Sequence, residues 1–176
     1  MTAHRAALGL GANLGDRHAA LQAAVDALLA AKGVRAVGVS GIYQTEPVGG
    51  PQDQPDFLNA VLVVDTSLTA HALLALANDV EAANGRVRGV RWGPRTLDID
   101  VLAVGQEVST AADLTLPHPR AHERAFVLVP WTDVDPGFEV PGLGKVADLL
   151  AALPRDDLLG VHRVGGPALH VERARR

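Results

Sequence analysis

The sequence predicts an α+β domain in which helices pack on an antiparallel sheet. The chain has 176 residues, the usual length of one domain. Short apolar runs rich in β-branched residues alternate with two longer segments of helical periodicity. Glycine, proline and helix-capping residues mark most of the boundaries between them. Hydrophobic residues make up 48% of the chain, so a core of ordinary size can form.

The first part of the chain predicts a strand, a helix and a second strand. Residues 6–11 are a short apolar run that ends in glycine. Asp16 can cap the helix that follows, which carries leucine and valine at helical spacing to about Ala31. Residues 34–45 alternate between apolar and polar, which predicts one strand with a bulge at Gly41.

The next part predicts a strand, a helix and a strand again. Residues 57–65 are rich in β-branched residues, and Ser67 or Thr69 can cap a second helix that ends near Asn84. Residues 96–104 predict the fourth strand. The resulting order, β-α-β-β-α-β, is the ferredoxin-like plan, in which two helices cover one face of an antiparallel sheet.

Weaker signals follow in the last third of the chain. After a hairpin, we expect a short helix at 119–125, a strand at 126–129 and a helix at 146–152. The core is therefore extended by C-terminal strand and helix elements. We expect one domain at 1–160 and a mobile tail at 161–176, where charged residues mix with glycine and proline.

Composition excludes several classes of protein. The chain has no cysteine, which excludes disulfide scaffolds and thiol nucleophiles. No apolar run is long enough to span a membrane, and the N-terminus lacks a signal peptide, so we expect a cytoplasmic protein. Aromatic residues make up 3% and the net charge is −4, so a nucleic-acid surface is not expected.

Two aspartates on the fourth strand are the first candidates for chemistry. Side chains two apart on a strand share a face, so Asp98 and Asp100 lie together, about 7 Å apart, opposite a core-facing Ile99. Paired carboxylates repel each other unless a cation lies between them, and oxygen ligands suit Mg²⁺. The alternative is an exposed face that carries two solvated acids.

An arginine-rich segment leads into that strand. Arg86, Arg88, Arg91 and Arg95 lie within ten residues and can reach the carboxylate face. Arginine pairs bidentately with phosphate oxygens, so arginines beside a magnesium site suit phosphoryl transfer. Trp92 argues against a fully solvated loop. Alternatively, these arginines pair with the acids.

Further candidates lie in the loops. Phe57 and Asn59 share a strand face after the long loop 44–59 and could stack on and hydrogen-bond a ring, or could belong to the edge of the core. His118 and His122 could bind zinc, but phosphate or nucleotide contact fits better because no third ligand is evident. Glu81, late in the second helix, is expected at the surface.

Four ordered motifs resemble one family. LGLGANLGD, YQTEPVGGPQDQPDFLNAV, GRVRGVRWGPRTLDIDVL and LPHPRAHERAFVLVPW together are similar to 6-hydroxymethyl-7,8-dihydropterin pyrophosphokinases, over about residues 5–155. The resemblance implies a monomeric enzyme of tetrahydrofolate biosynthesis. It would transfer pyrophosphate from ATP to the pterin hydroxymethyl group and release AMP. A nucleic-acid-binding module, a regulatory domain and an inactive paralogue are the rival interpretations.

The resemblance also implies roles for matching residues. Asp98 and Asp100 would hold two Mg²⁺ ions and act in catalysis together with Arg86 and Arg95. Residues matching nucleotide contacts are Glu81, Arg88, Ile99, Thr115, His118 and Arg124. Residues matching pterin contacts are Thr45, Val48, Phe57, Asn59, Trp92 and Phe126.

The sequence departs from the family pattern at four places. Gly49-Gly50 has one glycine more than is common, and the segment between Arg88 and Arg91 is about one residue short. Asn78 replaces a glutamine, which weakens one expected nucleotide contact, and Phe57 replaces a tyrosine. The aspartate pair is unaffected.

Overall fold

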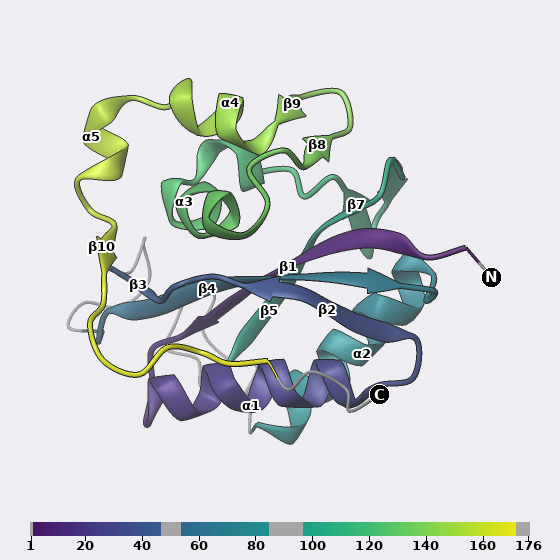
Figure 1. Cartoon of the computed structure of the whole chain (residues 1–176), viewed down its shortest axis with the longest axis horizontal. Coiled ribbons are helices and arrows are strands. Elements are labelled where there is room, and N and C mark those ends of the chain that lie inside the picture. The colour runs from purple at the N-terminus through teal and green to yellow at the C-terminus, as the bar shows by residue number, and fades with distance from the viewer. Residues whose placement is uncertain (1, 47–53, 85–96, 172–176) are drawn as a thin grey trace.

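A computed structural model describes residues 2–46, 54–84 and 97–171. Its centre is a six-stranded antiparallel sheet, in which β10, β3, β4, β1 and β5 are neighbours in that order and β2 also pairs with β4 (Figure 1). Helices lie over both faces of the sheet, so the predicted α+β class is confirmed. The strands are β1 (His4–Ala12), β2 (Val34–Val39), β3 (Tyr43–Thr45), β4 (Phe57–Thr66), β5 (Asp98–Val104) and β10 (His162–Arg163).

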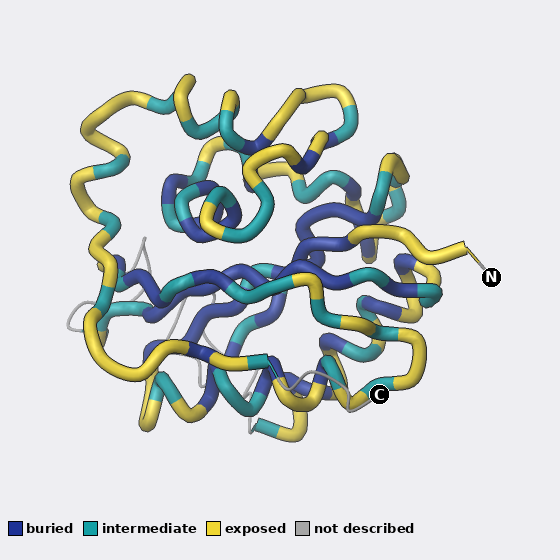
Figure 2. The backbone as a smooth tube through the Cα atoms, in the orientation of Figure 1, coloured by how far each residue is buried: buried dark blue, intermediate teal, exposed yellow. Residues whose placement is uncertain are grey.

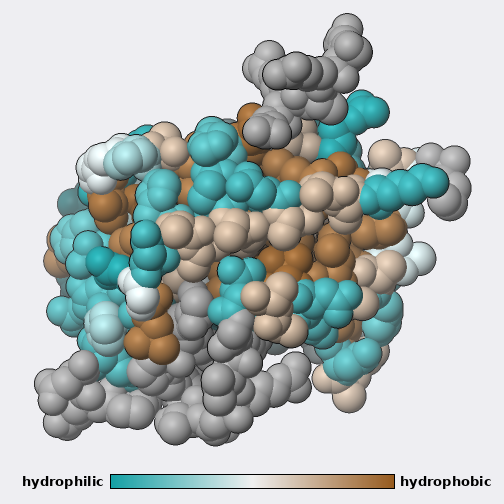
Figure 3. Space-filling model, turned by 90° about the horizontal axis from the view of Figure 1, so that it is seen from below, coloured by the Kyte–Doolittle hydropathy of each residue, from teal (hydrophilic) through white to brown (hydrophobic). Residues whose placement is uncertain are grey.

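Two fourteen-residue helices cover one face of the sheet, α1 (Arg17–Ala30) and α2 (Ala70–Ala83). The Asp16 carboxylate accepts a hydrogen bond from the backbone N–H of Ala19 at 3.0 Å, as predicted for the first cap. For the second helix the cap is Thr69, whose hydroxyl accepts from the backbone N–H of Ala72 at 3.1 Å. Hydrophilic residues are interspersed among hydrophobic ones on this side of the molecule (Figure 3).

The single strand predicted over residues 34–45 is two strands, β2 and β3, which pair with different parts of β4. Ser40 causes the break. Its backbone N–H bonds the carbonyl of Val61 at 3.0 Å, and its hydroxyl accepts from the backbone N–H of Val61 at 2.9 Å. A side chain thus replaces a backbone partner in the ladder. One register irregularity lies between Ala36 and Gly38. A second extra residue lies between Val39, which pairs with Leu62, and Tyr43, which pairs with Asn59, and this is where the bulge at Gly41 is predicted.

The predicted strand at residues 126–129 is wrong, because these residues belong to a helix, α3 (Ala125–Val134). Ala125, Val127, Leu128 and Trp131 are buried, which is a helical spacing inside a run that is apolar throughout. Short apolar runs of this kind do not distinguish strand from helix by periodicity. The other elements after β5 are a hairpin of β6 (Ser109–Ala111) and β7 (Leu114–Leu116), the 3-10 helix η1 (Ala121–Glu123), β8 (Glu139–Val140), β9 (Gly144–Lys145), α4 (Val146–Ala151) and α5 (Arg155–Leu158).

The sheet separates two hydrophobic clusters (Figure 2). The larger cluster fills the space between the sheet and α1 and α2. The smaller one lies between the sheet and α3 and α4, where the fully buried Trp131 contacts the edge of Phe138 with ring centroids 5.1 Å apart. Because both faces are covered, a site can open only where the covering elements end.

The C-terminal segment packs on the domain through Val171, where the sequence analysis predicts a mobile tail from residue 161. β10 pairs with β3 at the sheet edge, and the backbone N–H of Val164 bonds the carbonyl of Ile42 at 2.8 Å. Leu169 is only 6% exposed and belongs to the larger cluster. Within the described residues, no helix has the length and apolar character needed to cross a membrane.

Candidate active site

The register of the central strands places the predicted acidic and amide residues on one face of the sheet. We call this surface of β5, β1 and β4 the floor; it comprises Asp98, Asp100, Gly9, Gly11 and Asn59. Gly11 of β1 lies opposite Asp98 of β5 on one side and opposite Asn59 of β4 on the other. Gly9 lies opposite Asp100 in the same way. Directly opposed residues point to the same face, so the α carbons of Asp98 and Asn59 face one another across Gly11 at roughly 10 Å.

The predicted alternation along β5 is confirmed. Leu97, Ile99 and Val101 are buried in the cluster beneath α1 and α2, whereas Asp98 and Asp100 are half-buried on the opposite face. The Ile99 side chain is 4% exposed and therefore does not line the face that carries the aspartates. Of the predicted nucleotide contacts, Ile99 can offer only its backbone to that face.

Three residues predicted to contact the pterin lie together on β3 and β4. The Asn59 amide donates a hydrogen bond to the Thr45 hydroxyl at 2.8 Å, and both residues are buried. Thr45 lies directly opposite Phe57, whose ring is half-buried. A Cβ at Gly11 would lie 3.4 Å from the Asn59 amide oxygen and 3.7 Å from Cδ1 of Phe57, so glycine keeps this floor open.

Residues that precede and begin α3 approach the same end of the sheet. The backbone N–H of His118 bonds the carbonyl of Leu102, two residues beyond Asp100, at 2.8 Å. Burial lowers the pKa of the half-buried His118, the Arg124 charge lowers it further, and the Asp98 carboxylate opposes both. The Arg124 guanidinium carbon lies 5.5 Å from the ring centroid of Phe126. The structure thus brings His118, Arg124 and Phe126 toward the face of the aspartates.

Two predicted nucleotide contacts have unexpected or peripheral positions. Glu81 is 2% exposed, so its predicted surface position is wrong. It follows Ala77 by four residues and lies on the buried stripe of α2, a spacing that could have revealed its burial. Thr115 is exposed on β7, and its hydroxyl donates to the carbonyl of Ala111 at 3.5 Å.

The remaining predicted residues lie outside the described part of the chain. They are Val48, Arg86, Arg88, Trp92 and Arg95. The zinc alternative gains no third ligand from the structure, since the described residues contain no group of three or more His, Cys, Asp or Glu side chains that could hold a metal ion. His118 Nδ1 accepts a hydrogen bond from the backbone N–H of Arg120 at 3.2 Å.

Sequence reasoning missed a polar cluster that holds the chain just before Phe57. The Asn13 amide donates to the carbonyl of Pro55 at 3.2 Å, and the Arg17 guanidinium donates to the carbonyl of Asp56 at 2.8 Å. The Gln44 amide donates to the Asp56 carboxylate at 2.8 Å. These donors come from two segments, the turn into α1 and strand β3, and their acceptors lie about 40 and 12 residues further along the chain, so no local pattern in the sequence could have linked them.

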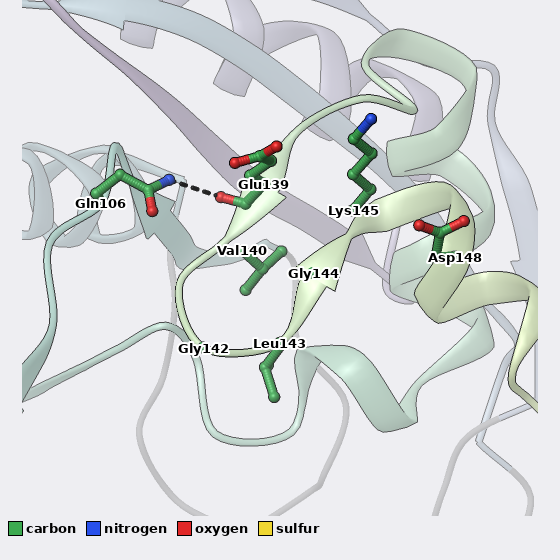
Figure 4. A pocket seen from close by; sticks show the side chains of 8 residues that line it. All are labelled: Gln106, Glu139, Val140, Gly142, Leu143, Gly144, Lys145 and Asp148. Carbon is green, nitrogen blue, oxygen red and sulfur yellow. Dashed lines mark hydrogen bonds between the residues drawn. The ribbon is translucent and has the colours of Figure 1, made fainter.

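A separate hollow of about 500 Å³ lies beside the β8–β9 hairpin (Figure 4). Glu139, Lys145 and Asp148 contribute its charged side chains, and the Gln106 amide donates to the carbonyl of Glu139 at 3.0 Å. None of the residues predicted from the sequence lines it. The candidate site is therefore the floor formed by β5, β1 and β4.

Comparison with known proteins places the chain among the pyrophosphokinases. The family model for 7,8-dihydro-6-hydroxymethylpterin-pyrophosphokinase (HPPK) matches residues 7–136. A 2-amino-4-hydroxy-6-hydroxymethyldihydropteridine pyrophosphokinase from Methylorubrum extorquens is 49% identical over 91% of this chain and 98% of its own length. The enzyme of that name from Pseudomonas aeruginosa is 40% identical over 92% of this chain and 98% of its own length.

The chain belongs to the HPPK family, and it transfers pyrophosphate to hydroxymethyldihydropterin in folate biosynthesis. The family and the reaction predicted from the sequence are thus confirmed. A crystal structure of an HPPK-DHPS in complex with substrates has a TM-score of 0.66 at 12% identity, covering 86% of this chain and 43% of that one. A Plasmodium falciparum HPPK-DHPS also has a TM-score of 0.66, covering 85% of this chain and 45% of its own. At these identities the likeness shows the fold alone.

Proposed function

We propose that ATP donates the pyrophosphate, that AMP is released, and that the floor formed by β5, β1 and β4 is where the transfer takes place. The single observation that carries this proposal is the row Asp98, Gly11 and Asn59 on adjacent strands. It puts a carboxylate pair and an amide on one face, with two glycines between them. The α carbons of Asp98 and Asn59 lie roughly 10 Å apart across Gly11, and we propose that the flat ring and the phosphate chain lie side by side over this span.

The aspartates suit magnesium. Asp98 and Asp100 offer only carboxylate oxygens, which are the ligands that Mg²⁺ prefers. The described residues supply no third acidic or histidine ligand, so water and phosphate oxygens would complete the coordination. We propose that the pair holds two Mg²⁺ ions, which would neutralise phosphate charge as it develops.

The pterin would lie in a slot between β4 and the start of α3. We define the pterin slot by four described residues: Thr45, Phe57, Asn59 and Phe126. The two phenylalanine rings would face the flat heterocycle, and the amide that Thr45 orients would hydrogen-bond its edge. Val48 and Trp92 are proposed to complete the slot.

The triphosphate would lie on the β5 side of the floor. His118 lies within the electrostatic influence of Asp98, Arg124 and Arg120. Arg86, Arg88 and Arg95 are proposed to contact the phosphates as well, and Glu81 and Thr115 the nucleoside. With its lowered pKa, His118 is neutral at pH 7, so it serves as a hydrogen-bonding group.

Catalysis of this transfer depends on positioning the two substrates more than on covalent chemistry by the protein. The pterin hydroxyl oxygen forms a bond to the β-phosphorus while the bond from that phosphorus to the α–β bridging oxygen breaks and AMP leaves. The hydroxyl proton must be lost to solvent, and no strong general base is evident among the described residues. Beside Mg²⁺ held by the aspartate pair the hydroxyl would be more acidic, and a contact with Asp100 would assist the loss of the proton. Arg86 and Arg95 would stabilise the charge on the transferred phosphates. Bound on one floor, the two substrates gain the rate advantage of a fixed orientation.

The strand order supports a ferredoxin-like description of residues 1–160, because β2 and β3, β4, β1 and β5 are antiparallel neighbours with α1 and α2 on one face. We propose one catalytic domain on that basis. That the enzyme is a cytoplasmic monomer stays a prediction from the sequence.

The decisive experiment measures AMP release from ATP. Wild type should release AMP only when both hydroxymethyldihydropterin and Mg²⁺ are present. Asp98→Ala and Asp100→Ala should each lower turnover by several orders of magnitude while the unfolding free energy stays near wild type. Asp26→Ala, which removes an exposed carboxylate from α1, is the matched control and should keep full activity. AMP release that ignores the pterin, or near-normal turnover in either site variant, would contradict the proposal.

A further inference from the structure

A hydrogen bond outside the predicted site joins β3 to α3. Tyr43 is the single tyrosine of the chain and is 7% exposed. Its hydroxyl donates to Oδ2 of Asp133 at 2.6 Å, and the backbone N–H of Gly41 donates to the same oxygen at 3.3 Å. One carboxylate oxygen on α3 therefore binds two donors from the segment that forms the β3 edge of the sheet.

These two residues belong to the elements that carry the pterin slot. Tyr43 lies directly opposite Asn59, and Thr45 on the same strand accepts the Asn59 hydrogen bond. Asp133 follows Phe126 by seven residues, so both project from the same side of α3, two turns or roughly 10 Å apart. The Tyr43–Asp133 bond thus connects the strand behind one wall of the slot to the helix that forms the other wall.

The C-terminal end of α3 rests closely on the sheet. A Cβ at Gly38 of β2 would lie 3.1 Å from Cγ1 of Val134, so a side chain there would force Val134 to shift. Figure 1 shows α3 lying above the strands β2, β3 and β4. The separation of helix and sheet at this end is therefore set by the close approach of the Val134 side chain to Gly38 and by the Tyr43–Asp133 bond.

Charges around Tyr43 keep its hydroxyl a donor. Burial and the Asp133 carboxylate raise the pKa of Tyr43 to about 12, and Arg163 acts in the opposite direction. Arg163 lies on β10 directly opposite Tyr43, and its guanidinium carbon would be 3.1 Å from a Cβ at Gly41. At neutral pH the phenol is uncharged and donates to the carboxylate.

We propose that Tyr43 and Asp133 are positioning residues that set the separation of the two walls of the pterin slot and so determine pterin affinity. This inference rests on the proposed function, because it assumes that Phe126 and the Thr45–Asn59 pair contact the pterin. In this proposal neither Tyr43 nor Asp133 contacts the pterin itself, and both act through the residues of the slot. Loss of the bond lets α3 as a whole, and with it Phe126, shift relative to the β3 edge.

The test compares Asp133→Ala, Tyr43→Phe and Asp133→Asn with wild type. Pterin affinity is measured by calorimetry with Mg²⁺ and a non-hydrolysable ATP analogue, and the affinity for the analogue is measured alone. Asp133→Ala and Tyr43→Phe should weaken pterin binding about tenfold and leave analogue binding within twofold. Asp133→Asn keeps an acceptor oxygen and should restore pterin affinity to within threefold of wild type. Asp135→Ala removes a neighbouring carboxylate that bonds Arg5, and it should leave pterin affinity unchanged.

Absorbance titration of the phenol gives an independent signal, because the chain has one tyrosine. In Asp133→Ala the midpoint should fall from about 12 toward the ordinary value of about 10. If the midpoint falls but pterin affinity in Asp133→Ala and Tyr43→Phe stays within twofold, the positioning role is refuted and the proposed function stands. Equal weakening of pterin and analogue binding would refute it too, as a general loss of structure. If wild type fails to bind pterin, the proposed function itself fails.

Discussion

The Thr45→Val substitution tests whether the buried hydrogen bond between β3 and β4 serves substrate binding. Thr45 and Asn59 are 8% and 7% exposed, and their bond is 2.8 Å long. Valine keeps the shape of threonine but removes the acceptor, which leaves a buried amide donor without that partner. An unsatisfied buried donor costs about 1–3 kcal/mol, so we expect the unfolding free energy to fall by that amount. Because the freed amide can turn away from the pterin edge, pterin affinity should fall about tenfold, equivalent to about 1.4 kcal/mol.

Urea denaturation and pterin calorimetry on the same preparations separate the two effects. Thr66→Val is the matched control, because Thr66 is 1% exposed at the far end of β4 and its hydroxyl donates to the carbonyl of Gly33 at 2.8 Å. It should lose similar stability and keep wild-type pterin affinity. If Thr45→Val behaves like Thr66→Val, losing stability alone, the Thr45–Asn59 bond belongs only to the core and our argument for the slot is refuted.

Two further predictions concern the floor and pH. Gly11→Ala should weaken pterin binding at least fivefold, because its Cβ would stand beside Asn59 and Phe57, and these are ordinary contacts, so the unfolding free energy should stay within about 1 kcal/mol of wild type. Gly9→Ala, whose Cβ contacts Leu102 instead, should keep wild-type pterin affinity. If calorimetry gives the two variants equal pterin affinities, the proposed slot is contradicted. His118 has a lowered pKa in the folded state through burial and Arg124, so the unfolded chain binds the proton more readily and stability falls as pH drops below about 6.5. His118→Gln should flatten this decline in denaturation curves between about pH 7 and 5.5, whereas parallel declines would contradict the assignment.

Local signals predicted the parts of the fold that local interactions decide. Asp16 and Thr69 cap their helices through hydrogen bonds to backbone groups three residues away, which a sequence pattern can show. Strand periodicity likewise placed Asp98 and Asp100 on the face opposite the core. These features depend on neighbours along the chain, so they could be predicted without knowing the tertiary structure.

The features that were missed depend on distant partners. The break between β2 and β3 arises because Ser40 bonds Val61, 21 residues away. The segment from β10 onward packs on the domain because β10 pairs with β3 and Leu169 enters the larger cluster, and no pattern in the sequence of this tail indicates such partners. The helix α3 replaces a predicted strand because packing against the sheet decides between two conformations that its apolar run allows equally.

The position of the site follows from a change of residue type along one face of the sheet. On that face β1, β4 and β5 carry small or apolar side chains where α3 and α4 cover them: Ala7, Val61, Val63 and Leu102 belong to the smaller cluster. One or two pleats further along the same strands stand Gly9 and Gly11, Asn59 and Phe57, and Asp100 and Asp98, which is the register of the candidate floor. Apolar burial thus ends within one pleat on the three strands. It ends before Gly9 on β1 and Asp100 on β5, and one pleat later on β4, where Val61, opposite Gly9, is still buried. A change that one strand shows alone could reflect a solvated end, but three adjacent strands that change within one pleat of each other define a shared surface, and this supports our proposal that both substrates bind there.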